Sequence, residues 1–566
     1  MHSAAECQKA LCFFCIMNHP DPLVRRSQAS HFFQQMPLTD DKDHVLVLSS
    51  LRNIAIAQPD DPEFPSLGIF TSMTRLIQKG IHHKQWLLKD QNIYIPYYAA
   101  HIIGTYATSN PQSAGKAAES GAIPALLELL RGKISWVEQR VAARALCHLA
   151  SHNVAFRATM SETEDIVELA MEIASSCLGT VYRQFLATEE RNRLKYHCEL
   201  LTRGLGGVET ENRKAEEWGV QLQEWCLYLL TCFAGKGSDR FLDRICESEF
   251  LKELCGMRGG IESCKDSPGG LGLIRELCNF EIGRDRISNR REVIENLCDV
   301  ARSSDSWHET AIECVVLLLK DPGTRNRVIG FSAAAMAQLV ELRRTGETIT
   351  RALLQDYHRI KYGEMRLGSF EVEKALEETW ELKVERKKKE KVMNTEELKQ
   401  RETMAGFLKR EGNESFWRGE VEKAVYEYSK ALEVCPLKLR RERIVLYSNR
   451  AQCCLVMKEA ELAIGDATRA LCLSGGSRPH RKSLWRRAQA FDMKGLSRES
   501  LMDGLRFVEV GRRKDVEIPC FAARLVKKQM HATWPFAAAV KSEVAAGKCK
   551  KVERFDHGAA FARADP

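Results

Sequence analysis

Long apolar runs are missing from this chain of 566 residues. No stretch of about 18 apolar residues occurs, and the N-terminus has no basic segment followed by a long apolar one. These absences argue against membrane insertion and against a secretory leader. Alternating apolar and polar patterns typical of β-strands are also scarce. We therefore expect an all-α protein of the cytoplasm, and the sequence leaves a nuclear location open.

The chain also lacks a large excess of either positive or negative charge. The chain carries 84 Lys and Arg against 76 Asp and Glu, a net charge of +8. A dedicated nucleic-acid binder usually has a much larger excess, so we expect no nucleic-acid partner. The 20 cysteines lie mostly inside apolar periodic segments without the spacing of a disulfide framework, which predicts buried thiols in a reducing compartment.

Motifs for catalysis and for cofactor binding are absent too. The glycines Gly269, Gly270 and Gly272 do not complete a dinucleotide fingerprint and follow no strand pattern. The chain has no HExxH metal motif, and no nucleophile, base and orienting acid can be recognised from their spacing. The sequence therefore predicts a protein that is not an enzyme and that holds no cofactor or metal ion.

What the sequence does contain, over residues 1–345, is a succession of apolar segments with helical period separated by short polar breaks. The clearest unit runs from Glu119 to Asn153. Pro124 suits the first turn of one helix, and Gly132 suits its end. The apolar stripe of the second helix is formed by Val141, Ala142, Ala145, Leu146 and Leu149. This pair, with small residues that allow close helix approach, resembles an armadillo repeat.

Weaker copies of the same pattern occur at Pro22–Pro37, Tyr97–Asn110 and Ile329–Leu342, and the segments between Phe156 and Ile282 are helical in pattern but irregular. Because one such unit cannot bury its apolar face alone, it must stack on its neighbours. We therefore expect an armadillo-like superhelix of degenerate repeats over residues 1–345.

Hydrophobicity falls and charge rises over residues 346–400. Basic and acidic residues alternate there at helical spacing: Lys383, Arg386, Lys387, Lys388, Lys389 and Lys391 with Glu381, Glu385 and Glu390. The mixed signs favour a solvated connecting helix between two domains, and a nuclear-localisation signal is the alternative interpretation.

One template recurs three times between Glu402 and Val510: a small residue, another twelve positions later, and further packing positions four and seven beyond that. The copies read Gly412, Ala424, Tyr428 and Ala431; Ala451, Ala463, Ala467 and Ala470; and Ala488, Ser500, Gly504 and Phe507. Such spacing lets the two helices of a hairpin cross closely, and it is the tetratricopeptide repeat pattern. We expect this domain over residues 401–536, with a capping helix in Asp515–Phe536 and a flexible tail over 537–566.

Five polar residues stand at fixed offsets from the small residue that marks each copy. They are Lys409, Asn413, Asn449, Lys482 and Arg486. The offsets belong to one face of a helix, so the first helices of three stacked hairpins would turn three cations and two amides toward one groove. This chemistry suits a short acidic peptide with a free carboxylate.

These residues stand in the motifs LKREGN, YSNRA and KSLWRRA, and the stretch from about Arg401 to Val510 resembles the carboxylate-clamp tetratricopeptide domains of co-chaperones such as the heat-shock organising protein. All five clamp positions carry that family's residue type. The resemblance implies binding of the C-terminal Glu-Glu-Val-Asp tail of seventy- or ninety-kilodalton heat-shock chaperones. Ser500 and Gly504 depart from the pattern and put the rigidity of the third hairpin in question.

The sequence thus predicts a co-chaperone adaptor with a chaperone tail in the hairpin groove and an unidentified client on the armadillo-like part. The alternative is an armadillo-type scaffold or transport adaptor that binds a basic or extended peptide and has no chaperone role. Armadillo grooves of that kind use ladders of Trp and Asn, but the tryptophans here share no repeat phase. They are Trp86, Trp136, Trp218, Trp225 and Trp307.

Overall fold

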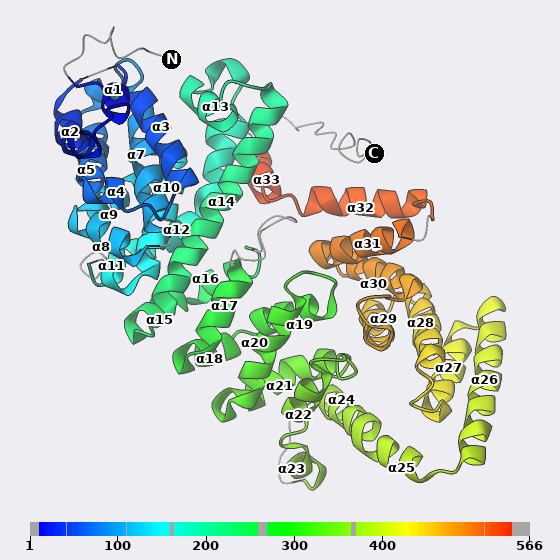
Figure 1. Ribbon diagram of the computed structural model, residues 1–566. Helices are drawn as coiled ribbons and strands as arrows, with labels where there is room; N and C mark the ends of the chain where they lie inside the picture. The colour runs from blue at the N-terminus through cyan, green and yellow to red at the C-terminus, as the bar shows by residue number, and fades with distance from the viewer. Residues whose placement is uncertain are drawn as a thin grey trace. The chain divides into compact units, whose positions relative to one another are not determined.

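The structure, a computed structural model, describes residues 11–40, 42–108, 110–158, 163–257, 269–363, 369–513 and 516–545. Within these ranges every regular element is helical (Figure 1), which confirms the all-α solenoid class. The chain forms two compact units. The first comprises Met1–Leu229 with Trp534–Pro566, and the second comprises Leu230–Thr533. The domain boundaries predicted near residues 345 and 400 therefore fall inside the second unit.

The first unit is a stack of helices of very different lengths. Their bounds are α1 (Phe13–Met17), α2 (Pro22–Gln35), η1 (Met36–Leu38), α3 (His44–Ala57), α4 (Glu63–Ser66), α5 (Ile69–His82), α6 (Lys84–Leu87), η2 (Asn92–Tyr94), α7 (Ile95–Ala107), α8 (Pro111–Glu119), α9 (Ala122–Leu130), α10 (Trp136–Ser151), α11 (Asn153–Ala158), α12 (Thr163–Val181), η3 (Tyr182–Leu186), η4 (Glu190–Asn192), α13 (Lys195–Thr202), α14 (Val208–Ala234) and α33 (Ala537–Ala545). The unit boundary lies within α14.

The repeat predicted from Glu119 to Asn153 forms α9 and α10, as expected. Gly132 follows α9 with a φ of 78°, a backbone conformation that favours glycine. The predicted apolar stripe of α10 is buried. Helix α10 packs closely on α7, because a Cβ at Gly104 would lie 3.1 Å from the Cα of Ala145. Small residues thus let consecutive repeats approach each other.

The second unit continues with short helices and ends in paired ones. Their bounds are α15 (Asp239–Ile245), α16 (Ser248–Leu254), α17 (Gly270–Cys278), α18 (Glu281–Ser288), α19 (Arg291–Arg302), α20 (His308–Lys320), α21 (Pro322–Met336), α22 (Gly346–Leu353), α23 (Tyr357–Lys361), α24 (Phe370–Trp380), η5 (Glu381–Glu385), α25 (Arg386–Val392), α26 (Thr395–Trp417), α27 (Val421–Val434), α28 (Arg440–Val456), α29 (Ala460–Ser474), α30 (Arg481–Met493), α31 (Ser497–Arg512) and α32 (Cys520–Ala532).

The charged segment 346–400 is helical in its described part, and part of it is packed rather than solvated. Arg386 Nη1 donates to the carbonyl oxygen of Leu432 at 2.9 Å. Just beyond the segment, Arg401 Nε donates to the carbonyl oxygen of Val434 at 3.0 Å. These two guanidinium groups therefore cap the C-terminal end of α27, where helix carbonyls lack partners. Lys387 and its neighbours toward the end of α25 remain exposed.

Helices α26 to α31 form three successive hairpins, drawn yellow to orange in Figure 1. Each hairpin turns through a residue with positive φ: Gly419 at 82°, Lys458 at 62° and Gly495 at 75°. In each turn the residue after this one donates its backbone N–H to the carbonyl oxygen five residues before it, with N–O distances of 2.8 to 2.9 Å. The same helix ending is thus used three times, and the second copy uses it without glycine.

The departures from the repeat pattern in the third hairpin have local reasons. Ser500 is fully buried and donates from Oγ to the carbonyl oxygen of Ala488 at 2.8 Å. A Cβ at Gly504 would lie 3.2 Å from Cγ2 of Val526, so glycine at this position makes room for α32. Helix α32 lies within the segment predicted to contain a capping helix, and it packs on α31.

The tail predicted to be flexible from residue 537 begins as a helix, α33, and residues 546–566 lie outside the described residues. Phe536, just before α33, is buried in the first unit, where its ring would lie 3.0 Å from a Cβ at Gly219.

Within the second unit, the hairpins pack against the segments that follow α19 and α21 through buried polar contacts. Arg443, at the start of α28, forms a bidentate ion pair with Glu341, with N–O distances of 2.8 and 2.6 Å. Arg487 pairs with Asp503, and Asp503 also accepts from Ser304 Oγ at 2.6 Å. Each buried charge here is compensated by a charged partner, so loss of one partner would leave the other buried and unpaired.

Candidate peptide-binding site

The first helices of the three hairpins carry the five predicted clamp residues. Lys409 and Asn413 are four residues apart on α26, and Lys482 and Arg486 are four residues apart on α30. Asn449 lies on α28, between them in the chain. Because residues four positions apart lie on the same side of a helix, each pair occupies one helix face. Hydrogen bonds show how far the structure brings the five together.

Asn413 and Asn449 meet directly. Asn449 Nδ2 donates to Asn413 Oδ1 at 3.2 Å, which links α28 to α26. The hydroxyl of Tyr428 donates to the same oxygen at 2.7 Å. Burial raises the pKa of Tyr428 to about 12, so the hydroxyl keeps its proton. Gly412 makes this possible, because a Cβ there would lie 2.8 Å from the tyrosine ring. Each amide keeps further polar capacity for a peptide backbone.

Arg486 links α30 to α28. Its Nη1 donates to the backbone oxygen and to Oγ of Ser448, at 2.6 and 2.5 Å, and its Nε donates to Gln452 Oε1 at 3.0 Å. No carboxylate lies within ion-pair distance of this guanidinium among the residues that the structure describes. Loss of hydration on burial lowers the pKa of Arg486. Its positive charge is therefore held by neutral groups only.

Several other buried or half-buried arginines of the hairpins have a carboxylate partner. Arg443 pairs with Glu341, Arg450 with Asp466 at 2.7 Å, and Arg487 with Asp503 at 2.6 Å. Burying a charge is costly unless it is paired. Arg486 has no such partner among the described residues, so an anion from outside would improve its electrostatics.

The two lysines stand in different states. The side chain of Lys482 is exposed at the start of α30. Lys409 Nζ lies 2.5 Å from Glu442 Oε2, so one cation of the predicted clamp is already neutralised by the chain itself. Glu442 is seven residues before Asn449, which places it on the same face of α28.

Sequence reasoning missed the supporting residues. Tyr428 was read only as a packing position, and Ser448, Gln452 and Glu442 were not singled out. The helical offset of Glu442 from Asn449 could have revealed it. The contacts of Ser448 and Gln452 to Arg486 depend on how α28 and α30 stack, which no local pattern encodes.

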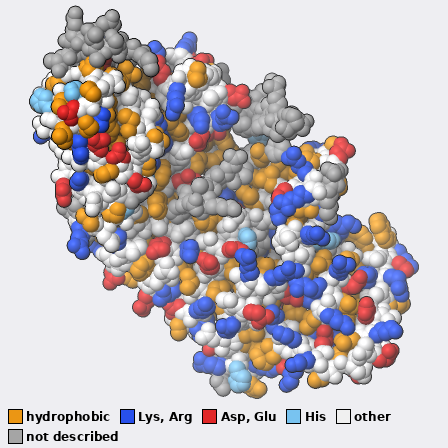
Figure 2. Space-filling view, viewed as in Figure 1, with side chains coloured by type: hydrophobic (Ala, Val, Ile, Leu, Met, Phe, Trp, Pro, Cys, Tyr) orange, Lys and Arg blue, Asp and Glu red, His pale blue; other side chains and the backbone are white. Residues whose placement is uncertain are grey.

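Figure 2 shows basic and acidic side chains interspersed over the visible face of the second unit. No broad field of one sign appears there. Electrostatic recognition on this face would therefore depend on local clusters of charge.

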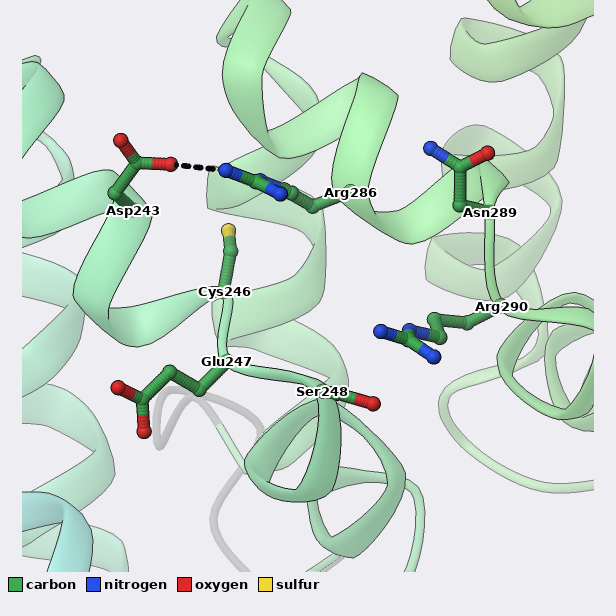
Figure 3. Close-up of a pocket in the computed structure, with 7 residues that line it drawn as sticks. All are labelled: Asp243, Cys246, Glu247, Ser248, Arg286, Asn289 and Arg290. Atoms are coloured by element: carbon green, nitrogen blue, oxygen red, sulfur yellow. Dashed lines mark hydrogen bonds and ion pairs between the residues drawn. The ribbon is translucent and has the colours of Figure 1, made fainter.

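The second unit also has an open pocket of about 440 Å³ among α15, α16 and α18 (Figure 3). It is lined by Asp243, Cys246, Glu247, Ser248, Arg286, Asn289 and Arg290. Asp243 and Arg286 neutralise each other at 2.9 Å. Burial raises the pKa of the Cys246 thiol to about 12, so it is not an activated nucleophile. The pocket has no visible catalytic arrangement.

Comparison with known proteins supports the armadillo-like part. Residues 4–247 match the Plant ARM repeat family. This range takes in the α9–α10 pair on which the sequence-based prediction depends. The N-terminal region is therefore an armadillo-like helical solenoid.

A second similarity is short. Over 88 residues the chain is 36% identical to Protein unc-45 homolog B of Danio rerio, a match that covers 16% of this chain and 9% of that protein. Because so little of the relative is covered, the similarity is one of a segment and not of the whole protein.

Two further findings concern membrane spanning and metal binding. No described helix is both long and apolar enough to span a bilayer. Among the described residues there is also no group of three or more His, Cys, Asp or Glu side chains suited to hold a metal ion.

Proposed function

We propose that this protein is a non-enzymatic adaptor of the co-chaperone type. Its hairpin groove binds the acidic C-terminal Glu-Glu-Val-Asp tail of a seventy- or ninety-kilodalton heat-shock chaperone. Its armadillo-like helices bind a client or second protein. Such a bivalent arrangement raises the local concentration of chaperone at the client without any chemistry of its own. The role fits a cytoplasmic protein.

The observation that carries this proposal is Arg486. Its guanidinium is half-buried on the same helix face as Lys482, is held by neutral oxygens, and stands one helix away from the Asn413–Asn449 pair. A C-terminal Asp presents two carboxylates close together, and convergent cations can replace their lost hydration. The amides are suited to hold the peptide backbone.

The expected affinity is moderate. Each charge-assisted contact contributes about 1.5–3 kcal/mol, and ordering a flexible peptide offsets part of the sum. A dissociation constant on the order of 1 µM, about −8 kcal/mol, is the expected result. The segment similarity to Protein unc-45 homolog B agrees with a repeat-based interaction protein.

A fluorescence polarisation titration of the full chain with a pentapeptide ending in Glu-Glu-Val-Asp tests the proposal. Lys482→Ala and Arg486→Ala should each weaken binding by about tenfold or more, and amidation of the peptide's C-terminus should weaken it as well. Lys423→Ala, a change of an exposed lysine on α27, is the matched control. Absence of binding, or binding that both clamp substitutions leave intact, would remove the proposal. Once binding is established, competition between the two chaperone tails would identify the preferred class of chaperone.

A further inference from the structure

The connection between α29 and α30 is contacted by guanidinium groups from other helices of the second unit. Arg440 Nη2, on α28, donates to the carbonyl oxygen of Leu473 at 3.0 Å. Arg506 Nη2, on α31, donates to the carbonyl oxygen of Gly476 at 2.9 Å. Two cations from different hairpins are thus held against residues 473–476 of one short connection.

A third guanidinium group comes from the segment between α21 and α22. A Cβ at Gly475 would lie 3.6 Å from Nε and 3.7 Å from Cζ of Arg343, so this side chain packs against the glycine. Arg478 adds a fourth cation from within the connection itself, and its side chain is exposed. We call Arg343, Arg440, Arg478 and Arg506 the arginine cluster.

Carboxylates compensate little of the charge of the arginine cluster. Arg343, Arg440 and Arg478 are exposed, and none of them forms an ion pair with a carboxylate in the part of the chain that the structure describes. Arg506 pairs with Glu509, but a second arginine pairs with the same carboxylate. The cluster therefore keeps a net positive charge that is open to solvent.

The backbone of the connection adds neutral donors. Ser474 Oγ accepts from the backbone N–H of His480 at 3.1 Å, which ties the two ends of the connection together. Between them, the backbone N–H groups of Gly476 and Ser477 have no hydrogen-bond acceptor among the described residues. Because Gly476 has no side chain, a ligand can approach this stretch of backbone closely. Successive unpaired N–H groups are suited to hold an anion.

We propose that the arginine cluster binds a phosphoserine or phosphothreonine side chain of a partner protein. Guanidinium groups that gather at one place need a ligand with more than one negative charge at one point. A phosphate monoester carries a charge of about −1.5 to −2 and three strong acceptor oxygens, whereas a carboxylate offers a single charge and two oxygens. The planar guanidinium fork matches the oxygens of a phosphate group, so several arginines can bind it together.

The compact arrangement favours a phosphorylated protein over a membrane surface. Clusters that bind anionic lipids have about four to eight basic residues beside a membrane helix or along an amphipathic one. Here the cations come from separate elements and surround one short connection. The carboxylate of Glu509 adjoins them and would be repelled by a flat anionic surface.

This inference goes beyond the proposed function. The arginine cluster contains none of the five clamp residues, and its ligand needs no free C-terminal carboxylate. A phosphorylated partner could therefore bind whether or not the hairpin groove takes a chaperone tail.

The test uses the full chain and a fluorescein-labelled Gly–Ala heptapeptide with phosphoserine at its centre and both ends blocked. Fluorescence polarisation should show binding roughly tenfold tighter than that of the same peptide with serine or glutamate at the centre. Arg343→Ala and Arg440→Ala should each weaken binding about tenfold, and Arg343→Lys should weaken it less, because lysine keeps the charge but loses the fork. Arg418→Ala, a change of an exposed arginine on α26, is the control and should have no effect.

Arg343 donates no hydrogen bond among the described residues, so Arg343→Ala should keep the thermal midpoint and report on binding alone. Absence of phosphopeptide binding, equal binding of the glutamate peptide, or binding that Arg343→Ala and Arg440→Ala leave intact would overturn the proposal.

Two competitors separate the alternatives. An unlabelled pentapeptide ending in Glu-Glu-Val-Asp should not displace the phosphopeptide, and displacement would overturn the proposal by placing the phosphate in the hairpin groove. Phosphatidylcholine vesicles with and without phosphatidylserine form a separate arm. Binding to the anionic vesicles without any phosphopeptide binding would overturn the proposal in favour of a membrane surface. If the pentapeptide does not bind at all, the proposed function fails while the phosphopeptide result stands by itself.

Discussion

Glu442 offers the sharpest perturbation of the proposed clamp. Its carboxylate stands 2.5 Å from Lys409 Nζ, where a peptide carboxylate would have to bind. The two side chains are 44% and 26% exposed, so water screens the pair and its strength is about 0.5–1 kcal/mol. A peptide that uses Lys409 must displace this interaction and also approach the negative charge of Glu442.

Glu442→Gln should therefore tighten binding of the acidic pentapeptide by about two- to fivefold. The assay is fluorescence polarisation of the full chain at low salt, repeated at high salt, where the gain should shrink because screening already weakens the pair. Glu420→Gln, which removes a comparable exposed pair with Lys423 on α27, should change nothing. Unchanged or weaker peptide binding by the Glu442 variant would refute the reasoning, because it would show that Lys409 does not contact the peptide.

Three further changes test stability. Glu341→Gln leaves the buried guanidinium of Arg443 without its carboxylate and should lower the free energy of unfolding by about 3–5 kcal/mol, measured as a lower thermal midpoint. An unchanged midpoint would show that the hairpins fold independently of the preceding helices. Lys458→Gly relieves the strain of a positive φ and should stabilise the second hairpin by roughly 0.5–1 kcal/mol in urea unfolding, and a loss of stability would contradict this. Burial raises the pKa of Glu138 from 4.5 to about 7. Because the unfolded state loses this proton at lower pH than the folded state, the free energy of unfolding should fall by roughly 3 kcal/mol between pH 4.5 and pH 7. Glu138→Gln should abolish this part of the pH dependence, measured as thermal midpoints from pH 4 to 8, and an unaltered slope would assign the dependence to other groups.

Much of the local structure could be predicted from the sequence, because it depends on short-range chemistry. The period of the apolar residues gave the helices, and Pro124 and Gly132 placed α9 correctly. The spacing of Gly412, Ala451 and Ala488 gave the three hairpins, since small residues are needed wherever two helices cross closely. The five clamp residues could be assigned to common helix faces for the same reason.

Only the tertiary structure decided how charges are paired. That Glu442 neutralises Lys409 and that Arg486 has neutral partners both follow from stacking between successive hairpins. The charged segment before α26 looked like a solvated linker, yet Arg386 caps α27. Local sequence determines helix period and turns through backbone sterics, whereas the environment of a charge depends on which side chains packing brings within a few ångströms of it.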